Sequence, residues 1–280
     1  MSLEVPLGLL AGAALGWGAW LALAPIWDTE VLSRSNFRGR RLPVGGGLVL
    51  VIAVLAASAG VVAWRVVVGE LPGVRPAELA GIMAVLGFAL LGFLDDVLGG
   101  SGVRGLRGHL QEAVAGRITT GMLKLIGGFT VALLCVAAVT SGSVIQTGID
   151  LLLVAAAANL ANLFDLAPGR AIKVAVPVFA ALALAWGSGT GLFVPAVVVG
   201  AALGLLVPDL RERIMLGDTG ANPLGAVLGL AVVASGAEPT RVVVCAVVVL
   251  LNVLSEFVSF GRLIDRVPPL RLADRIGRRP

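Results

Sequence analysis

The chain has 280 residues, of which 58% are hydrophobic and only 14% are charged. So large an apolar fraction cannot be buried inside one soluble domain, which excludes the soluble globular classes and indicates a protein with several membrane-spanning helices. Tyrosine is absent and His109 is the one histidine, so the composition also excludes paired-histidine catalysis and histidine-rich metal sites.

Nine apolar stretches are long enough to cross a hydrocarbon layer of roughly 30 Å, which takes about 20 residues of helix. The predicted spans are 5–26, 44–68, 77–94, 121–140, 146–163, 171–187, 190–207, 222–236 and 240–260. The eighth is short, and only residues 187–191 separate the sixth from the seventh, so the count is nine to within one. The first lacks the basic start and cleavage site of a signal peptide, and we expect it to stay as a membrane helix. The sequence therefore predicts a single all-α, polytopic membrane bundle over residues 1–280, with a basic tail over 261–280.

Basic residues fall on one side of this predicted bundle. Of the 21 Lys and Arg residues, 18 lie in one alternating set of connections, and only Arg65, Arg75 and Arg241 lie in the other. The positive-inside rule makes the basic set cytoplasmic, with the N-terminus outside and the C-terminus in the cytoplasm. The net charge of +4 then reflects topology and does not call for nucleic acid. A basic face suits anionic lipid headgroups or phosphorylated substrates.

Two adjacent carboxylates, Asp95 and Asp96, end the third span. Acidic side chains at the end of a membrane helix are costly unless a cation needs them, and hard divalent cations bind such oxygens. Neighbouring side chains on a helix point about 100° apart, so one Asp can hold a metal while the other faces a substrate proton or a lysine. The alternative is a pair of exposed acids that only solvate a helix end.

Three more candidate residues lie at the predicted starts of two helices: Gly45, Gly46 and Lys124. Pro43 can begin the second helix, and Gly45 and Gly46 leave backbone N–H groups free to bind phosphate or let a neighbouring helix pack closely. Lys124 at the start of the fourth span is either a snorkelling lysine or a phosphate partner.

Three polar residues, Asn159, Asn162 and Asp165, end the fifth span at a spacing of three, which places them on one helix face. They could contact a sugar, a base or a metal-bound water, or form hydrogen bonds between helices. Arg170 beyond them offers a cation. Asp218, in the string Gly-Asp-Thr-Gly before the eighth span, is either a functional carboxylate or an N-cap.

These motifs occur in a fixed order: Pro43-Val44-Gly45-Gly46, Gly92-Phe93-Leu94-Asp95-Asp96, Asn159 to Asp165, and Gly217-Asp218-Thr219-Gly220. In order and sidedness the set resembles the polyprenyl-phosphate N-acetylhexosamine-1-phosphate transferase family, over about residues 36 to 260. That family includes the phospho-N-acetylmuramoyl-pentapeptide transferases of peptidoglycan synthesis.

The resemblance implies a reaction at the cytoplasmic face of a bacterial-type plasma membrane, with Mg²⁺ as cofactor and Mn²⁺ as an alternative. The implied partners are a UDP-sugar, polyprenyl phosphate and the lipid bilayer, and a homodimer is left open. The implied catalytic residues are Asp95, Asp96 and Asp218. Asp96 and Asp218 would contact the metal or diphosphate, and Asp95 would lie at the lipid phosphate as a candidate base, the division between Asp95 and Asp96 being open. The implied substrate-binding residues are Asn159, Asn162, Asp165, Lys124, Arg170, Gly45 and Gly46.

The chain departs from the family pattern in its third motif. Family members commonly continue it as Asp-Gly-x-Asp-Gly, whereas this chain has Asp165-Leu166-Ala167-Pro168-Gly169. The histidine-rich loop of the muramoyl-pentapeptide enzymes and a tenth span are absent from this sequence. We therefore expect a UDP-N-acetylhexosamine or an unusual donor in place of UDP-N-acetylmuramoyl-pentapeptide. The alternatives are a non-catalytic paralogue that binds polyprenyl phosphate or scaffolds a glycan assembly complex, and a small transporter. A transporter predicts polar groups at mid-membrane and often internal repeats, and we find no repeat.

Overall fold

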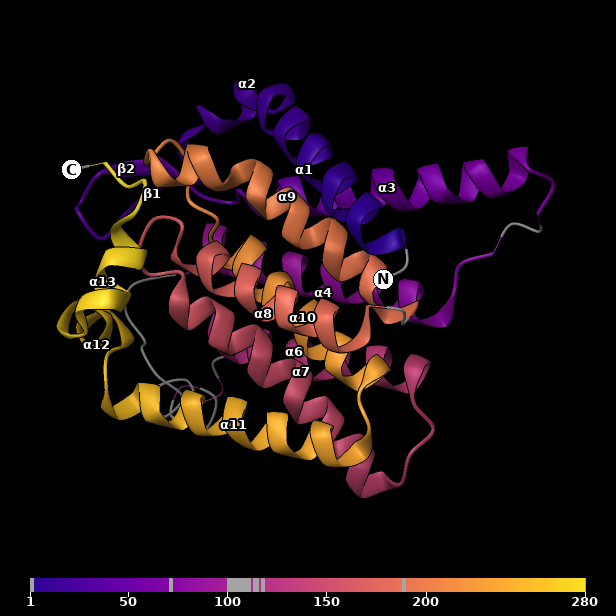
Figure 1. The fold of residues 1–280 in the computed structure, drawn as a ribbon. Helices are drawn as coiled ribbons and strands as arrows, with labels where there is room; N and C mark the ends of the chain where they lie inside the picture. Colours follow the sequence, from indigo (N-terminus) through magenta and orange to yellow (C-terminus); the bar gives the residue numbers. More distant parts are fainter. Residues whose placement is uncertain are drawn as a thin grey trace.

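The computed structural model describes residues 3–70, 73–99, 112, 116, 119–187 and 190–279, and His109 lies outside them. It is a bundle of long helices with one small hairpin (Figure 1). The long helices are α1 (Glu4–Ala22), α3 (Leu48–Val67), α4 (Pro76–Leu98), α6 (Thr120–Val139), α7 (Val144–Phe164), α8 (Arg170–Trp186), α9 (Phe193–Leu210), α10 (Asp218–Ser235) and α11 (Glu238–Phe257). The short elements are α2 (Ala24–Trp27), η1 (Glu30–Leu32), β1 (Ser33–Ser35), β2 (Arg41–Pro43), η2 (Thr190–Leu192), α12 (Phe260–Arg266) and α13 (Pro268–Arg275).

The predicted all-α membrane bundle is confirmed. Each of the nine predicted spans overlaps one long helix of the described chain, and the sixth and seventh form the separate helices α8 and α9. Seven of these helices are long and apolar enough to cross a membrane. The other two are α8, with 17 residues, and α10, with 18 residues and a polar first turn.

Helix α10 lies at the centre of the bundle, where it packs against α4, α7, α8 and α9. Its residues from Thr219 to Val233 are buried. Helices α1 and α9 pack through small residues: a Cβ at Gly12 would lie 2.2 Å from the carbonyl oxygen of Val197. Close backbone approach of this kind is how membrane helices associate, since lipid gives them no hydrophobic driving force. Helix α11 packs mainly on α7 and leaves a lipid-facing row that includes Val243, Val247 and Leu250.

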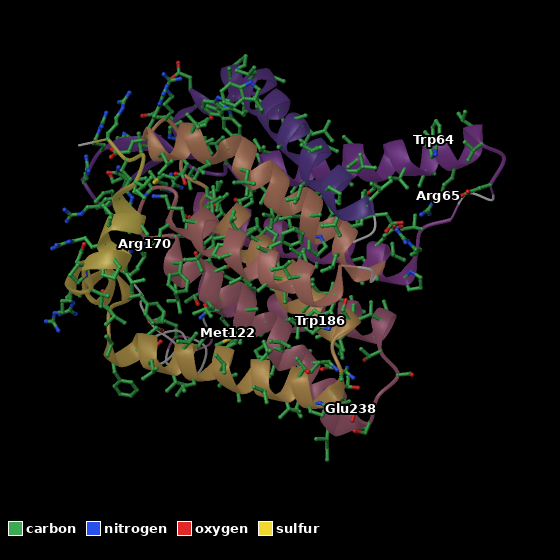
Figure 2. The ribbon with its side chains drawn as sticks, in the orientation of Figure 1. Trp64, Arg65, Met122, Arg170, Trp186 and Glu238 are labelled. Atoms are coloured by element: carbon green, nitrogen blue, oxygen red, sulfur yellow. The ribbon has the colours of Figure 1, made fainter. Side chains whose placement is uncertain are left out.

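One end of the bundle carries the β1–β2 hairpin together with α12 and α13 (Figure 1). We call it the hairpin end. The two strands pair antiparallel, with Arg34 opposite Leu42. Nitrogen-tipped side chains gather at this end, where Arg170 is labelled, while Arg65 and Glu238 mark the opposite end (Figure 2).

Helix boundaries differ from the predicted ones where backbone contacts take over. Pro43 does not begin the second helix: it ends β2, and α3 begins only at Leu48. Helix α4 continues to Leu98, so Asp95 and Asp96 lie within its last turn. Helix α10 begins at Asp218 and not at residue 222, because the Asp96 side chain of α4 binds its first N–H groups.

We expect single-cysteine variants to report which end of the bundle faces outward. Ser143→Cys and Ala237→Cys should react with a membrane-impermeant maleimide on intact cells, while Arg211→Cys and Arg271→Cys should react only after lysis. All four positions are exposed, whereas the native Cys135 and Cys245 are buried. Labelling of Arg211→Cys from outside would contradict the orientation derived from the basic residues.

Candidate functional site

The four sequence motifs meet at the hairpin end, around the first turn of α10. The glycine motif pairs with the segment before α10: Gly46 N–H donates to the Met215 carbonyl at 3.1 Å and Gly47 N–H to the Leu216 carbonyl at 3.0 Å. In return Met215 N–H donates to the Pro43 carbonyl at 2.8 Å. These hydrogen bonds fix the start of α10 against the start of α3.

Glycines are required where this turn is tightest. A Cβ at Gly47 would lie 2.1 Å from the backbone nitrogen of Gly220, and one at Gly92 would lie 2.2 Å from the carbonyl oxygen of Asp218. Gly217 has a φ of +69°, a conformation that side chains disfavour. Since Gly46 already donates its N–H to backbone, the structure gives the glycine motif a packing role, and contact of Gly45 or Gly46 with substrate stays a prediction.

Asp96 caps α10 from the last turn of α4. One carboxylate oxygen accepts from the Asp218 N–H at 3.1 Å, and the other accepts from the N–H and the hydroxyl of Thr219 at 3.0 and 2.6 Å. The first N–H groups of a helix have no intrahelical partner, so this carboxylate supplies what the helix start lacks. Asp96 thereby sets the direction in which Asp218 points. Direct contact of Asp96 with a metal stays a prediction.

Asp218 lies at the centre of a charged cluster. Its Oδ2 atom accepts from the Lys124 ammonium and, at 3.3 Å, from the side-chain amide of Asn162. Lys124 also lies 3.7 Å from a carboxylate oxygen of Asp95, which is itself next to the Asp218 carboxyl. Met122, labelled in Figure 2, marks the first turn of α6, from which Lys124 reaches the cluster. One cation thus serves two neighbouring carboxylates.

Asp165 joins the site from the end of α7, where its Oδ2 atom accepts from the Gly217 N–H at 3.0 Å. Burial raises the pKa of this carboxyl well above its ordinary value, and the charges of Asp209, Asp218 and Asp96 raise it further. Asp165 and Asp218 line a cavity of about 340 Å³, as do Asp209 and Glu212. We call it the acidic cavity.

Two of these acids, Asp209 and Glu212, are not among the site residues predicted from the sequence. Asp209 is buried, and its Oδ2 atom accepts from the Gly169 N–H at 2.8 Å. Glu212 is also buried and pairs with Arg40 at 3.1 Å and Arg38 at 3.3 Å, which fastens the hairpin to the site. The signal for Asp209 was the same as for Asp95: a carboxylate at the end of an apolar span.

Two predicted residues make other contacts. The amide of Asn159 donates to the side-chain oxygen of Asn252 on α11 at 2.7 Å, which is the alternative of a hydrogen bond between helices. Arg170 is buried and binds both oxygens of Asp274 in α13, at 2.9 and 3.0 Å. A role for Asn159 or Arg170 in binding substrate stays a prediction.

The cluster fits a cation that is shared with a ligand. Within the described part of the chain, no three acidic, histidine or cysteine side chains form a ready metal cage. Mg²⁺, however, usually takes only one or two carboxylates and completes its shell with water and phosphate oxygens. Asp218 and Asp95 offer that number, and they share the single charge of Lys124, which leaves one negative charge of the pair without a partner in this cluster. A divalent cation with a phosphorylated ligand would supply the balance.

The chain is similar to known proteins over most of its length. Residues 79–236 match the family model described as Glycosyl transferase family 4. The phospho-N-acetylmuramoyl-pentapeptide-transferase of Desulforamulus reducens is 31% identical over 247 residues, covering 81% of this chain and 72% of the relative. The protein of that name from Shouchella clausii is 28% identical, covering 85% and 76%, and the one from Moorella thermoacetica is 32% identical, covering 70% and 66%.

We expect Asp96 to matter more for stability than its neighbour. Asp96→Ala leaves two N–H groups and a hydroxyl without their acceptor, and should lower the unfolding free energy by about 1–3 kcal/mol. Asp95→Ala removes only a partly exposed ion pair, worth roughly 0–1 kcal/mol. Thermal unfolding in detergent, followed by tryptophan fluorescence, measures both. Equal melting temperatures for the two variants would contradict the capping role.

Proposed function

Since this chain belongs to glycosyl transferase family 4, we propose that it transfers a sugar 1-phosphate from a UDP-sugar to polyprenyl phosphate. The products are UMP and a polyprenyl-diphospho-sugar for cell-surface glycan synthesis. The observation that carries this proposal is the convergence of Lys124, Asp95 and Asp218 beside a cavity at one end of a membrane bundle.

The reaction depends mainly on neutralising the negative charge of the phosphates, and the protein has little covalent chemistry to perform. An oxygen of the lipid phosphate forms a bond to the β-phosphorus of the donor, and the bond from that phosphorus to the bridging oxygen breaks. UMP leaves with the electron pair. Positioning and electrostatic stabilisation provide most of the catalysis in such transfers. An acidic cavity would repel a diphosphate, so Mg²⁺ or Mn²⁺ held by Asp218 and Asp95 would supply the positive charge.

The chain's own residues have distinct tasks in this proposal. Lys124 can donate to a phosphate oxygen when the ligand replaces part of its contact with Asp218. Asn162 and Asp96 hold Asp218 in place from α7 and α4. Asp165 lines the acidic cavity with an oxygen left over from its bond to Gly217, and that oxygen can accept from a sugar or ribose hydroxyl.

The proposed setting is the cytoplasmic face of a bacterial plasma membrane. The family and the apolar helices support a multi-pass membrane protein, and the basic connections support the side. The proposed donor is a UDP-N-acetylhexosamine, as expected from the departures in the third motif. A UDP-sugar is water-soluble whereas polyprenyl phosphate is a lipid, so a site at one end of the bundle is where the two can meet.

We expect Asp218→Asn and Lys124→Gln to lower UMP release by about 100-fold or more, because each removes charge next to the transferred phosphoryl group. The assay uses purified protein, undecaprenyl phosphate, Mg²⁺ and a panel of UDP-sugars that includes UDP-N-acetylglucosamine and UDP-N-acetylmuramoyl-pentapeptide. Chelation by EDTA should stop the reaction and added Mg²⁺ should restore it.

Glu238→Gln, which changes an exposed acid at the opposite end of the bundle, is the matched control and should keep full activity. If wild-type protein binds polyprenyl phosphate yet releases UMP from no donor, the non-catalytic alternative is correct. If Asp218→Asn retains activity, the site is elsewhere.

A further inference from the structure

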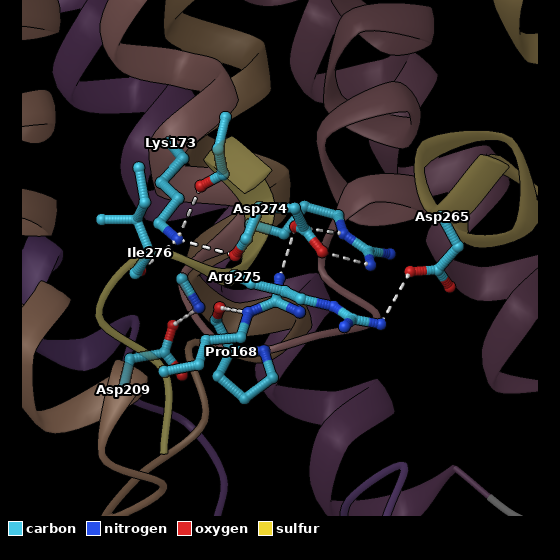
Figure 3. A network of polar contacts seen from close by, with 11 residues as sticks. Pro168, Lys173, Asp209, Asp265, Asp274, Arg275 and Ile276 are labelled. Carbon is cyan, nitrogen blue, oxygen red and sulfur yellow. Dashed lines mark hydrogen bonds and ion pairs between the residues drawn. The ribbon is translucent and has the colours of Figure 1, made fainter. Parts of the chain in front are cut away.

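Helices α12 and α13 fold back over the start of α8 at the hairpin end (Figure 1). A polar network holds them there (Figure 3). Asp274 accepts from Arg170 and from Arg278, and Arg278 also donates to the Pro168 carbonyl at 2.9 Å. Lys173 donates to the carbonyls of Asp274 and Ile276 at 2.7 and 2.6 Å, which caps the end of α13. The tail is therefore a fixed part of the fold.

The Asp274 carboxylate stays ionised in this network. Burial alone would raise its pKa, but hydrogen bonds and charge from Arg170 and Arg278 outweigh burial and leave the pKa below its ordinary value. Its contribution to stability is thus present above about pH 4, the ordinary Asp value, and is lost as pH falls through the lowered pKa. One acid between the buried Arg170 and the partly buried Arg278 still leaves a net positive charge.

A second cavity, of about 590 Å³, lies between the tail and the hairpin. We call it the arginine pocket, because its charged lining consists of Asp265 and six arginines: Arg38, Arg170, Arg262, Arg275, Arg278 and Arg279. It shares the wall residues Phe37, Leu166 and Ala167 with the acidic cavity but shares no charged residue with it. The two cavities are therefore neighbours of opposite charge.

Several arginine nitrogens in this pocket are available to a ligand. Arg170 uses Nε and Nη2 for Asp274, and its Nη1 atom would lie 3.5 Å from a Cβ at Gly261 on the pocket wall. Arg262 and Arg279 lie on exposed chain, and their guanidinium groups form no ion pair with any described residue. Anchored and free guanidinium groups together offer the forked donors that fit a phosphate.

Helix α13 and the residue that follows it carry apolar side chains that suit a membrane surface. Leu270, Leu272 and Ile276 are 48%, 68% and 62% exposed. They follow α11, whose last residue, Phe257, is 80% exposed. Exposed apolar groups that alternate with arginines next to a membrane helix are typical of segments that lie at the headgroup level.

From the pocket, its charge and its place beside the membrane, we propose that the arginine pocket binds the phosphate headgroup of an anionic phospholipid without a divalent cation. The ligand is a component of the surrounding membrane. This site uses none of the carboxylates of the acidic cavity, so it stands whether or not the transfer reaction does.

The test measures binding of dihexanoyl phosphatidylglycerol to purified full-length protein in neutral detergent with EDTA, with dihexanoyl phosphatidylcholine for comparison. We expect saturable binding of phosphatidylglycerol, weakened by about tenfold or more in the double variant Arg262→Gln/Arg279→Gln, since each lost charged hydrogen bond weakens binding severalfold or more. The matched control is Arg266→Gln/Arg271→Gln, which removes the same charge from exposed positions of α12 and α13 outside the pocket. It should change the affinity less than about twofold.

Each other outcome overturns the proposal in a defined way. An equal loss in both double variants would mean that general surface charge binds the lipid. Equal binding of phosphatidylcholine would exclude recognition of the anionic headgroup. Displacement of phosphatidylglycerol by equimolar inorganic phosphate would make the pocket a site for soluble phosphate, and displacement by equimolar undecaprenyl phosphate would make it part of the acceptor site. Both double variants should elute as wild type in gel filtration, which shows that they are folded.

Discussion

The contact between Asp96 and the start of α10 is the interaction on which the arrangement of the site depends. In a membrane protein the first N–H groups of a central helix have little access to water, and leaving one unpaired costs about 1–3 kcal/mol. Asp96 pairs with two of them and with the Thr219 hydroxyl. Because Gly92 lets α4 approach so closely, the cap also sets the distance between α4 and α10. The Asp218 side chain then points toward Lys124.

Acidic and basic side chains are distributed unevenly around this cap. Carboxylates from α4, α7, α9 and α10 gather near the acidic cavity, and Lys124 is the cation in direct contact with Asp95 and Asp218. At the same end, Arg38 and Arg40 pair with Glu212, and Arg170 and Arg278 pair with Asp274. An arginine placed among the carboxylates would stabilise the empty protein, but it would also remove the attraction for a ligand-bound cation. Uncompensated charge of this kind is typical of functional sites.

The nine long helices of the described residues could be predicted from sequence because span length follows from the thickness of the membrane. The sequence also predicted that four polar residues would lie at one end of the bundle, since alternating spans return to the same side. They are Asp95, Asn162, Asp165 and Asp218. Residue spacing alone could not show that Asn159 and Asn162 have different partners, because both lie on one face of α7. The start of α10 contacts that face at Asn162, whereas α11 covers it one turn earlier, at Asn159. Which helix packs where is a tertiary property, and for the same reason the clamp between Arg170 and Asp274 could not be predicted.

Pro168 is the position at which the sequence departs most from the family pattern, and its surroundings bear on the proposed donor site. The loop is held on both sides: Arg278 binds the Pro168 carbonyl, and the Gly169 N–H donates to Asp209. Asp209 comes from α9, yet it lines the acidic cavity together with Pro168. The cavity therefore keeps a carboxylate beside this loop even though the motif has lost one. In the proposed reaction, Asp209 would lie beside the donor at the place where Pro168 replaces the acid of the family pattern.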